Sequence, residues 1–380
     1  MSKVNILHLT HTDLRYDNRI LKELEALSEI DNFRIMALGV LLKENATYAE
    51  RKISASLFNF NLFSNRLKFL PRPISYFCLL IEITFRSFFY SFKSKPDIIH
   101  CHDTMVLPVG VIMKLFFKSK LIYDAHELES NKNGQSIALS KVTLFLERIC
   151  WSKIDHLISV SESIINWYQK IIGFKQSTLI LNSPIISNNC QTDFNGYFHN
   201  KYNIPFEKLV FVYLGYLGKG RSIETIIDVF TNSSVDSHII FVGYGELEYE
   251  ISSYVKKCKK IHLHDAIAHD KIVQIVKSAD VGFCLIENIS LSDYYCLPNK
   301  FFEYIFAGVP VISSNFPELV SMIDKYKLGI YCDLNESSIF NAVKFLESKP
   351  PGKIKDKLSE ISWHAQTQKL KMAYQLLIKK

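Results

Sequence analysis

Short apolar runs alternate along the chain with segments of helical periodicity. Runs typical of buried strands occur first at Ile6–Leu9, Phe33–Ala37, Asp97–His100, Leu121–Tyr123 and His156–Val160. A second series follows at Leu209–Leu214, His238–Val242, Asp280–Leu285, Val309–Ser313 and Gly329–Cys332. Helical spacing predicts helices at Asp17–Glu29, Ser140–Ser152, Ser161–Ile171, Ile223–Phe230, Leu247–Lys257, Asp270–Val276 and Asn299–Ala307. This alternation predicts an α/β fold of doubly wound parallel sheets, each covered by helices on both faces.

The two series indicate two Rossmann-like domains. The segment between them is rich in Asn, Ser and Pro and has little apolar periodicity, as is typical of a linker. We expect a first domain over residues 1–182, a linker over 183–205, a second domain over 206–360 and a terminal helix over 361–380. Periodicity leaves open whether that helix packs on its own domain or crosses to the first. Ligands of such folds bind beyond the carboxyl ends of the strands, so we expect the domains to face a cleft.

Composition excludes several classes of protein. The chain has 380 residues, 48% of them hydrophobic and 22% charged, which rules out low-complexity disorder. The 8 Cys residues are scattered singly, so neither a disulfide framework nor zinc-ribbon spacing is present in the sequence. The N-terminal residues are too polar for a signal peptide and resemble a first strand. We therefore expect a cytoplasmic protein with reduced thiols and no metal site.

Basic residues concentrate between Arg51 and Lys95. This segment carries eight Lys or Arg residues and one acid, Glu82, so it accounts for the whole net charge of +7, and it also holds eleven aromatic residues. Basic and aromatic residues interleaved in this way are typical of a surface that lies on an anionic membrane. The alternative is a pair of core helices with solvated basic residues. Nucleic acid is not an expected partner, because no binding motif accompanies the charge.

A glycine-rich turn follows the first strand of the second domain. Gly215 and Gly218 permit a tight turn, and a predicted helix starts directly afterwards. A helix N-terminus attracts anions, and Lys219 and Arg221 are placed to bind a diphosphate. The alternative is an ordinary turn with two solvated cations. Gly243, in a second glycine turn after the next strand, would let a ligand approach the backbone.

Another group of polar residues interrupts the aromatic stretch near residue 300. Pro298 directly precedes a predicted helix whose first turn carries Asn299 and Lys300, and Glu303 lies one turn further on. An amide, an ammonium group and a carboxylate at a helix start can hold a phosphate and a ribose diol. The alternative is an ordinary capped helix.

These motifs carry a family resemblance. The chain resembles a GT-B glycosyltransferase of family 4, the retaining, nucleotide-sugar-dependent class common in bacterial surface-polysaccharide assembly. The matching segments are Asp17–Ile20 with Lys22 and Glu23, Asp97–Asp103, Tyr123–Glu127, Gly215–Arg221, Gly243–Gly245, Ser278–Asp280 and Leu297–Pro310. Residues Trp363 to Tyr374 are similar to the terminal crossover helix of that fold.

The resemblance implies roles for individual residues. Glu303 matches the ribose-binding Glu, and Arg221 matches the basic diphosphate clamp, with Lys219 or Lys300 assisting. Four residues form the implied catalytic set: His126, Arg221, Lys300 and Glu303. The implied donor-binding residues are Gly215, Gly218, Lys219, Arg221, Gly243, Tyr295, Pro298, Asn299, Lys300 and Glu303. Asp17, Arg19, His102 and His126 are the acceptor-side candidates, and Asp124 and Glu127 are placed to orient the His126 ring.

One position departs from the family pattern. The family pairs two Glu residues separated by seven others, and the first position here is Tyr295 rather than Glu. Asp293, two residues away, is a possible substitute. The departure concerns the contact to the hydroxyls of the donor sugar, and it leaves the phosphate and ribose contacts in place.

The function implied is transfer of a sugar from a nucleotide diphosphate sugar to a glycan or lipid-linked glycan, with retention of configuration. The resemblance implies no metal or other cofactor, and a location at the inner face of the cell membrane. Two alternatives stay open: a nucleotide-sugar 2-epimerase of the same fold, and a non-catalytic partner subunit with a decayed donor site.

Overall fold

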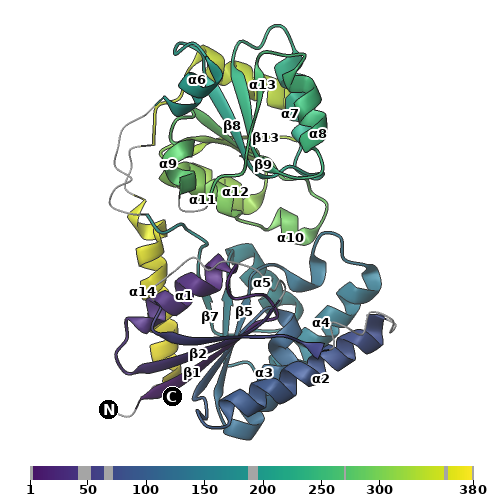
Figure 1. Ribbon diagram of the computed structural model, residues 1–380, viewed down its shortest axis with the longest axis vertical. Coiled ribbons are helices and arrows are strands. Elements are labelled where there is room, and N and C mark those ends of the chain that lie inside the picture. The colour runs from purple at the N-terminus through teal and green to yellow at the C-terminus, as the bar shows by residue number, and fades with distance from the viewer. Residues whose placement is uncertain are drawn as a thin grey trace. The chain divides into compact units, whose positions relative to one another are not determined.

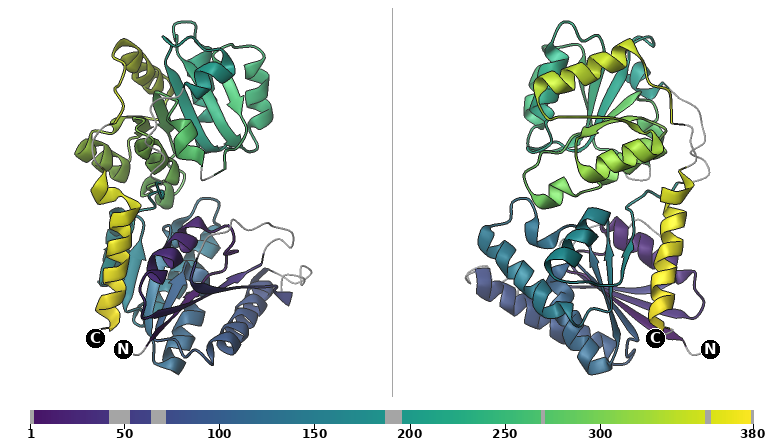
Figure 2. Two further views of the ribbon diagram at one scale, coloured as in Figure 1. Left: turned by 60° about the vertical axis from the view of Figure 1, so that its left-hand side comes forward. Right: turned by 180° about the vertical axis from the view of Figure 1, so that it is seen from behind.

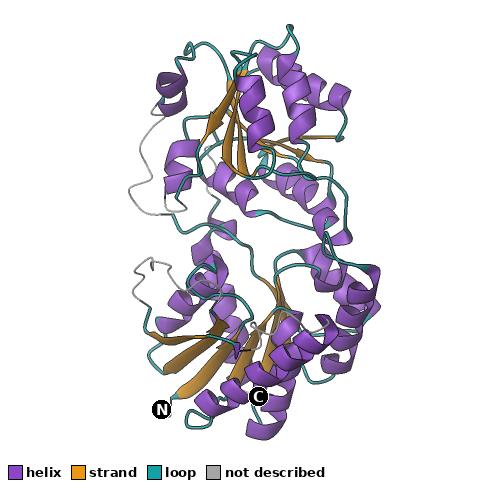
Figure 3. Cartoon of the chain, turned by 45° about the vertical axis from the view of Figure 1, so that its right-hand side comes forward, coloured by secondary structure: helices purple, strands orange, loops and turns teal. Residues whose placement is uncertain are grey.

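The computed structural model describes residues 3–41, 53–63, 72–186, 196–268, 271–354 and 358–378, with only the backbone described for 72–77. The chain divides into two compact units. The first unit is Met1–Leu181 together with Gln366–Lys380, and the second is Asn182–Ala365. Each unit is a parallel sheet with helices on both faces (Figure 3). The predicted fold class, two Rossmann-like α/β domains, is therefore confirmed.

The first unit is built on a seven-stranded parallel sheet in the order β3-β2-β1-β4-β5-β6-β7 (Figure 1). Its strands are β1 (Val4–Leu9), β2 (Phe33–Val40), β3 (Ala55–Phe60), β4 (Ile98–His102), β5 (Lys120–Ala125), β6 (His156–Ser159) and β7 (Ser177–Leu179). Its helices are α1 (Asn18–Ser28), α2 (Arg72–Ser91), α3 (Leu107–Phe117), α4 (Ile137–Trp151), α5 (Glu162–Ile171) and most of α14 (Trp363–Ile378). The chain order reverses beside β1, which makes the sheet doubly wound.

The second unit has a six-stranded parallel sheet in the order β10-β9-β8-β11-β12-β13. Its strands are β8 (Val210–Tyr216), β9 (His238–Tyr244), β10 (Ile261–His264), β11 (Val281–Cys284), β12 (Val311–Ser314) and β13 (Gly329–Cys332). Its helices are α6 (Tyr197–Tyr202), α7 (Ile223–Thr231), α8 (Glu248–Val255), α9 (Ile272–Val276), α10 (Leu291–Tyr294), α11 (Asn299–Phe306), α12 (Pro317–Tyr326) and α13 (Glu336–Ser348).

The central strands form where the sequence predicts them, because their side chains are buried on both faces. Ile98 and Ile99 in β4 and Leu121 and Ile122 in β5 are all essentially inaccessible to solvent. The edge strands β3, β7 and β10 were not predicted, whereas the edge strand β13 was. An edge strand has a neighbour on one side only, so it needs fewer apolar residues and leaves a weaker pattern.

The expected linker at 183–205 differs from the structure in its last part. Residues 197–202 form α6, which packs on the second unit through the fully buried Phe198. The Tyr202 hydroxyl donates to the Leu263 carbonyl at 2.8 Å, and that of Tyr197 lies 2.8 Å from His264 Nε2. The pattern of apolar residues in the sequence does not reveal these contacts of the aromatic side chains. Residues 187–195 of the expected linker lie outside the described residues.

The C-terminal helix resolves the alternative that periodicity left open. From Gln366 onwards α14 belongs to the first unit, along which it runs in Figure 2. Leu370 and Tyr374 are fully buried there, and the Gln366 side chain accepts a hydrogen bond from Leu181 N at 3.1 Å. The helix therefore crosses back because its apolar stripe completes the first unit's core.

Candidate active site

Two glycine turns lie together at the carboxyl ends of β8 and β9. An added Cβ at Gly243 would lie 1.9 Å from the Gly215 carbonyl oxygen, and one at Gly245 would lie 2.3 Å from that of Leu217. Only glycine permits this close approach of the two backbones, and both residues have positive φ. At Gly215 a Cβ would meet no described atom within 4 Å, so this strand end presents open backbone. The turns therefore form a surface that a ligand can approach.

The rest of the first turn is arranged around Tyr216 and Glu246. An added Cβ at Gly218 would lie 2.3 Å from the Tyr216 ring, which explains a glycine at this position. The exposed Lys219 donates its backbone N–H to Glu246 Oε1 at 3.1 Å.

Arg221 and Asp293 bring two predicted regions together. The Arg221 guanidinium is partly exposed, and its Nη1 lies 3.5 Å from Asp293 Oδ1. Asp293 lies in the short helix α10, and the Ser290 hydroxyl donates to its carboxylate at 2.7 Å. Of Asp293 and Tyr295, Asp293 is thus the residue for which a contact with Arg221 is seen.

Glu287 occupies the start of α7, where the sequence predicted an anion site. Its Oε1 accepts hydrogen bonds from the Ser222 backbone N–H at 3.0 Å and from the Ser222 hydroxyl at 3.4 Å. Its own N–H donates to the Gly220 carbonyl at 3.0 Å. The Glu287 carboxylate therefore contacts Ser222, the N-cap residue of α7, which directly follows Arg221 in the chain. Sequence reasoning missed Glu287 because no motif surrounds it.

Helix α11 carries the second predicted group. It begins after Pro298 with no side-chain cap, so its first amides and the positive end of its dipole are available to an anion. Asn299 is exposed, and Lys300 Nζ lies 4.1 Å above the centre of the Tyr213 ring. The Glu303 side chain is buried, with 7% of the residue exposed.

Tyr304 positions this helix against the sheet. Its hydroxyl accepts a hydrogen bond from Leu214 N at 2.7 Å and lies 3.2 Å from the Val212 carbonyl and 3.3 Å from that of Phe283. Its ring covers Gly282, where an added Cβ would lie 2.5 Å from the ring. These contacts tie α11 to β8 and β11, so Asn299, Lys300 and Glu303 are held at the carboxyl edge of the sheet.

The first unit contains a buried polar layer on the central strands. Strand pairing places His8 of β1 beside His100 of β4, and His102 beside Asp124 of β5. His100 and His102 are two residues apart, so both point to the same face of the sheet. All four side chains are fully buried. Alternating histidines in otherwise apolar strands were the sequence signal for this layer, and His102 was the one residue of these four predicted as a site residue.

A chain of hydrogen bonds connects these histidines to the C-terminal helix. His126 Nε2 lies 3.1 Å from His102 Nδ1, and His102 Nε2 lies 3.0 Å from His8 Nδ1. The Tyr374 hydroxyl lies 3.1 Å from His8 Nε2 and 2.6 Å from His100 Nδ1. Burial lowers the pKa of His8, His100 and His102, that of His100 to about 3, so these three rings are neutral.

Asp124 is the acidic centre of the layer. The Arg19 guanidinium binds both of its oxygens, with Nη2 3.1 Å from Oδ1 and Nε 3.3 Å from Oδ2. Arg19 also donates to the Ile180 carbonyl at 3.1 Å and lies 3.2 Å from Glu23. Although burial opposes ionisation, Arg19 and His126 hold the pKa of Asp124 well below its usual range. Arg19, expected on the acceptor side, is buried and orders Asp124 instead of facing solvent.

His126 differs from the other histidines because its side chain is partly exposed. Its Nε2 lies 3.1 Å from Asp124 Oδ2, and its Nδ1 lies 3.7 Å from Asp103 Oδ1. Burial lowers the pKa of His126, but these two carboxylates outweigh it and raise the pKa to about 10. His126 is therefore an imidazolium at neutral pH.

Asp17, the remaining candidate on the acceptor side, caps α1 by accepting a hydrogen bond from Ile20 N at 3.1 Å.

The polar layer includes side chains close enough to one another to hold a metal ion. Glu23, His100, His102 and Asp124 form one such group. However, Arg19 contacts both carboxylates of this group. Ring nitrogens of His100 and His102 are also within hydrogen-bonding distance of other side chains of the layer, Tyr374 for His100 and His8 and His126 for His102. The arrangement fits a hydrogen-bonded network better than a metal centre.

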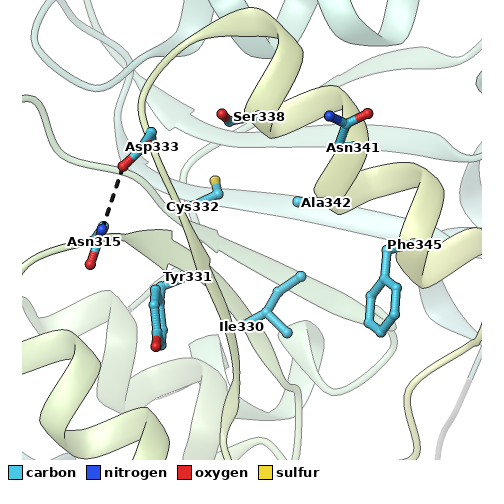
Figure 4. Close-up of a pocket in the computed structure, with 9 residues that line it drawn as sticks. All are labelled: Asn315, Ile330, Tyr331, Cys332, Asp333, Ser338, Asn341, Ala342 and Phe345. Atoms are coloured by element: carbon cyan, nitrogen blue, oxygen red, sulfur yellow. Dashed lines mark hydrogen bonds between the residues drawn. The ribbon is translucent and has the colours of Figure 1, made fainter.

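A shallow hollow lies at the far edge of the second unit's sheet, between β13 and α13 (Figure 4). Its lining includes Tyr331, Asp333 and Phe345, and Asn315 donates to Asp333 Oδ1 at 3.4 Å. None of the predicted donor-binding residues lines it, so we assign it no part in the site.

Residues 197–362 match the family model of glycosyl transferases group 1. The matched segment contains the glycine turns, Arg221 and α11, and it coincides with most of the second unit. No curated protein matches the chain by sequence. Among the described helices, none combines the length and the hydropathy needed to cross a lipid bilayer.

Solved structures of glycosyltransferases share the fold over the whole chain. Sucrose-phosphate synthase from Thermosynechococcus elongatus has a TM-score of 0.80 at 15% identity, covering 99% of this chain and 100% of that one. Anabaena HepE in complex with UDP-glucose has a TM-score of 0.67 at 13% identity, covering 99% and 98%. The lipopolysaccharide outer core galactosyltransferase WaaB has a TM-score of 0.64 at 12% identity, covering 98% and 99%. The chain therefore has the GT-B fold.

Proposed function

We propose that this protein is a glycosyltransferase that moves a sugar from a nucleotide diphosphate sugar to a glycan or lipid-linked glycan acceptor. The observation that carries the proposal is the group at the carboxyl edge of the second unit's sheet: Arg221, Lys300 and Glu303 beside the open backbone of Gly215. The family match over residues 197–362 supports it, and so does the binding of UDP-glucose by HepE, which has the same fold.

Each of these groups has a proposed task in donor binding. Arg221 and Lys300, with the uncapped amides of α11, bind the diphosphate and stabilise its charge as the bond from the sugar C1 to oxygen breaks. Glu303 accepts hydrogen bonds from the ribose hydroxyls. Asp293, held near Arg221, takes the place of the carboxylate missing at Tyr295 and binds a donor-sugar hydroxyl. These fixed cations serve the role that a metal would otherwise fill.

On the acceptor side, we assign His126 to electrostatic stabilisation. With a pKa raised to about 10 by Asp103 and Asp124 against the effect of burial, its ring is protonated and cannot act as a general base at neutral pH. It can donate a hydrogen bond. The acceptor proton therefore passes to the departing diphosphate, with attack from the same face of the sugar and retention of configuration.

We place the reaction in bacterial surface-polysaccharide assembly, at the inner face of the cell membrane. The family resemblance and the likeness in fold to WaaB support this assignment. An epimerase of the same fold is the second candidate. It would convert a nucleotide sugar in the absence of any acceptor, which a donor-only incubation detects.

The test is a thermal-shift screen of the protein against UDP-, GDP-, dTDP-, ADP- and CMP-sugars and the free nucleotides. A donor at 100 times its Kd should stabilise the protein by about 2.7 kcal/mol. Arg221→Ala should abolish the shift with the same donor, whereas Lys259→Ala, a cation on the α8–β10 connection, should keep it. Absence of any shift from a cooperatively melting wild-type sample would favour the decayed-site alternative.

Turnover then tests the assigned roles. Arg221→Ala and Glu303→Ala should each lower kcat/KM for the donor by about 10²–10³-fold. Wild-type kinetics in either variant would remove that residue from the site.

A further inference from the structure

Helix α2 exposes large apolar side chains on its outward face. Its inward face carries Ile83, Ser87 and Ser91, which are buried. Its outward face carries Phe85 and Phe89, which are 74% and 80% exposed. A helix that covers a sheet in water normally places its apolar stripe inward. The serines let α2 pack closely on the unit, and the phenylalanines face away from it.

Helix α4 likewise exposes apolar side chains, and besides the apolar Cys150 and Trp151 it buries a charged residue. Its inward Glu147 is fully buried and accepts hydrogen bonds from the hydroxyls of Thr104, Tyr123 and Tyr168 at 2.6–3.0 Å. Its outward positions include Phe145, which is 61% exposed. Two helices of one unit thus bury polar groups and expose apolar ones.

Helix α3 contacts both α2 and α4, so the three helices form one layer on the first unit (Figure 1). Phe88 and Phe116 join α2 to α3, with ring centres 5.2 Å apart. The exposed apolar residues on or directly after these helices are Ile81, Phe85, Phe89, Tyr90, Phe92, Ile112, Leu115, Phe116, Ile137, Leu139, Val142, Phe145 and Ile149. We call this set the apolar face. Exposure on this scale is typical of an interaction surface.

Basic residues predominate among the charged side chains at the surface of these three helices. The acids on the three helices are Glu82, which pairs with Arg86 at 2.8 Å, and the buried Glu147. The exposed charged side chains on or next to the helices include Lys93, Lys118, Lys141 and Arg148. Two copies packed through this face would bring like charges together, whereas an anionic surface complements them.

We propose that the apolar face docks on an anionic lipid surface, with the aromatic side chains at the acyl boundary and the basic side chains near the headgroups. This surface differs from the one expected from the sequence over residues 51–95. Residues 55–60 form the paired strand β3, in which Phe60 is buried, and 51–52 and 64–71 lie outside the described residues. The docking surface instead extends through α3 and α4. Delivery of the first unit to a lipid-linked acceptor is a consequence that rests on the proposed function.

The test is co-sedimentation of the full chain with sonicated vesicles, either pure phosphatidylcholine or an equal mixture with phosphatidylglycerol. The wild type should pellet with the anionic vesicles at low salt and be released at high salt. Phe85→Ser with Phe89→Ser should weaken binding by about tenfold or more, because apolar area no longer enters the interface. Phe145→Ser should weaken it as well. Tyr249→Ser, 88% exposed on the second unit, is the matched control and should bind as the wild type does.

Three results would overturn the proposal: no pelleting of the wild type, equal pelleting with neutral and anionic vesicles, or wild-type binding by the α2 double variant. Light scattering can give a fourth such result. A wild type that is a dimer and a double variant that is a monomer would show that the face mediates self-association. The thermal shift with soluble donor should be unchanged in the double variant, so failure of docking and failure of the proposed function are distinguishable.

Discussion

The two units share the same architecture, but the central strands of their sheets carry different kinds of buried side chain. In the second unit, the strands β8, β9 and β11 contribute Phe211, Phe241 and Phe283 to a continuous apolar cluster. In the first unit, the equivalent central strands contribute histidines and an aspartate, linked by hydrogen bonds and one guanidinium. Apolar burial is non-directional and tolerates small shifts. A buried polar layer is stable only if each member keeps its partners. The first unit should therefore be sensitive to the loss of single polar atoms, and the second to changes of volume.

The largest effect should follow from Asp124→Asn. The variant leaves the buried Arg19 without its ionised partner, so we expect the first unit to lose about 3–5 kcal/mol of stability. Chemical denaturation followed by fluorescence measures this loss. Asp236→Asn, which removes an exposed ion pair with Lys208 in the second unit, is the control and should change stability little. Equal, small losses in both variants would contradict the view that the polar layer stabilises the first unit.

Gly282→Ala tests the second unit. The new Cβ would lie 2.5 Å from the Tyr304 ring, so we expect a loss of about 2–3 kcal/mol and a weaker thermal shift with donor, because Tyr304 positions α11. The matched control is Gly352→Ala, where an added Cβ meets no described atom within 4 Å and stability should be unchanged. Normal donor binding in a destabilised Gly282→Ala protein would separate α11 from the donor site.

Tyr374→Phe isolates one hydroxyl of the polar layer. It leaves nitrogens of His8 and His100 without their shared partner, and we expect a loss of about 1–2 kcal/mol. Tyr326→Phe, which removes a hydroxyl bonded to the exposed Glu360, should cost less. The comparison is made by thermal denaturation at a single pH. A Tyr374→Phe protein as stable as the wild type would show that the histidine chain does not need its link to α14.

The last prediction concerns the pH dependence of stability. The pKa of His126 is raised in the folded protein to about 10, so its stabilising contribution is complete below the unfolded value of about 6.5 and is lost as pH rises towards 10. The difference in melting temperature between the wild type and His126→Gln should therefore shrink from pH 6 to pH 10. His364→Gln, at an exposed position, should show no such trend. A difference that is constant with pH would mean that His126 is not held as a cation.

The sequence allowed candidate site residues to be predicted where a polar or charged residue directly follows a strand or begins a helix. Arg221, Lys300 and Glu303 follow strands or begin helices, and the sequence shows which ends of the strands they follow. The partners of these residues were less accessible to sequence reasoning. Glu287 contacts Ser222 from a different loop, and Asp293 reaches Arg221 across 72 residues of chain. Such contacts depend on how the loops pack, which periodicity does not encode.

The sequence by itself determined the α/β class, the central strands and the direction of the sheets, because strands buried on both faces must be apolar almost throughout. It also determined that His8, His100 and His102 interrupt such strands. Only the tertiary structure decided which partners these histidines contact. Strand register set His102 beside Asp124, and α14 returned from the end of the chain to place Tyr374 between His8 and His100. It likewise decided that Phe85 and Phe89 face outward while Ser87 and Ser91 face inward, since the packing of α2 on the unit, and not its composition, selects which side is buried.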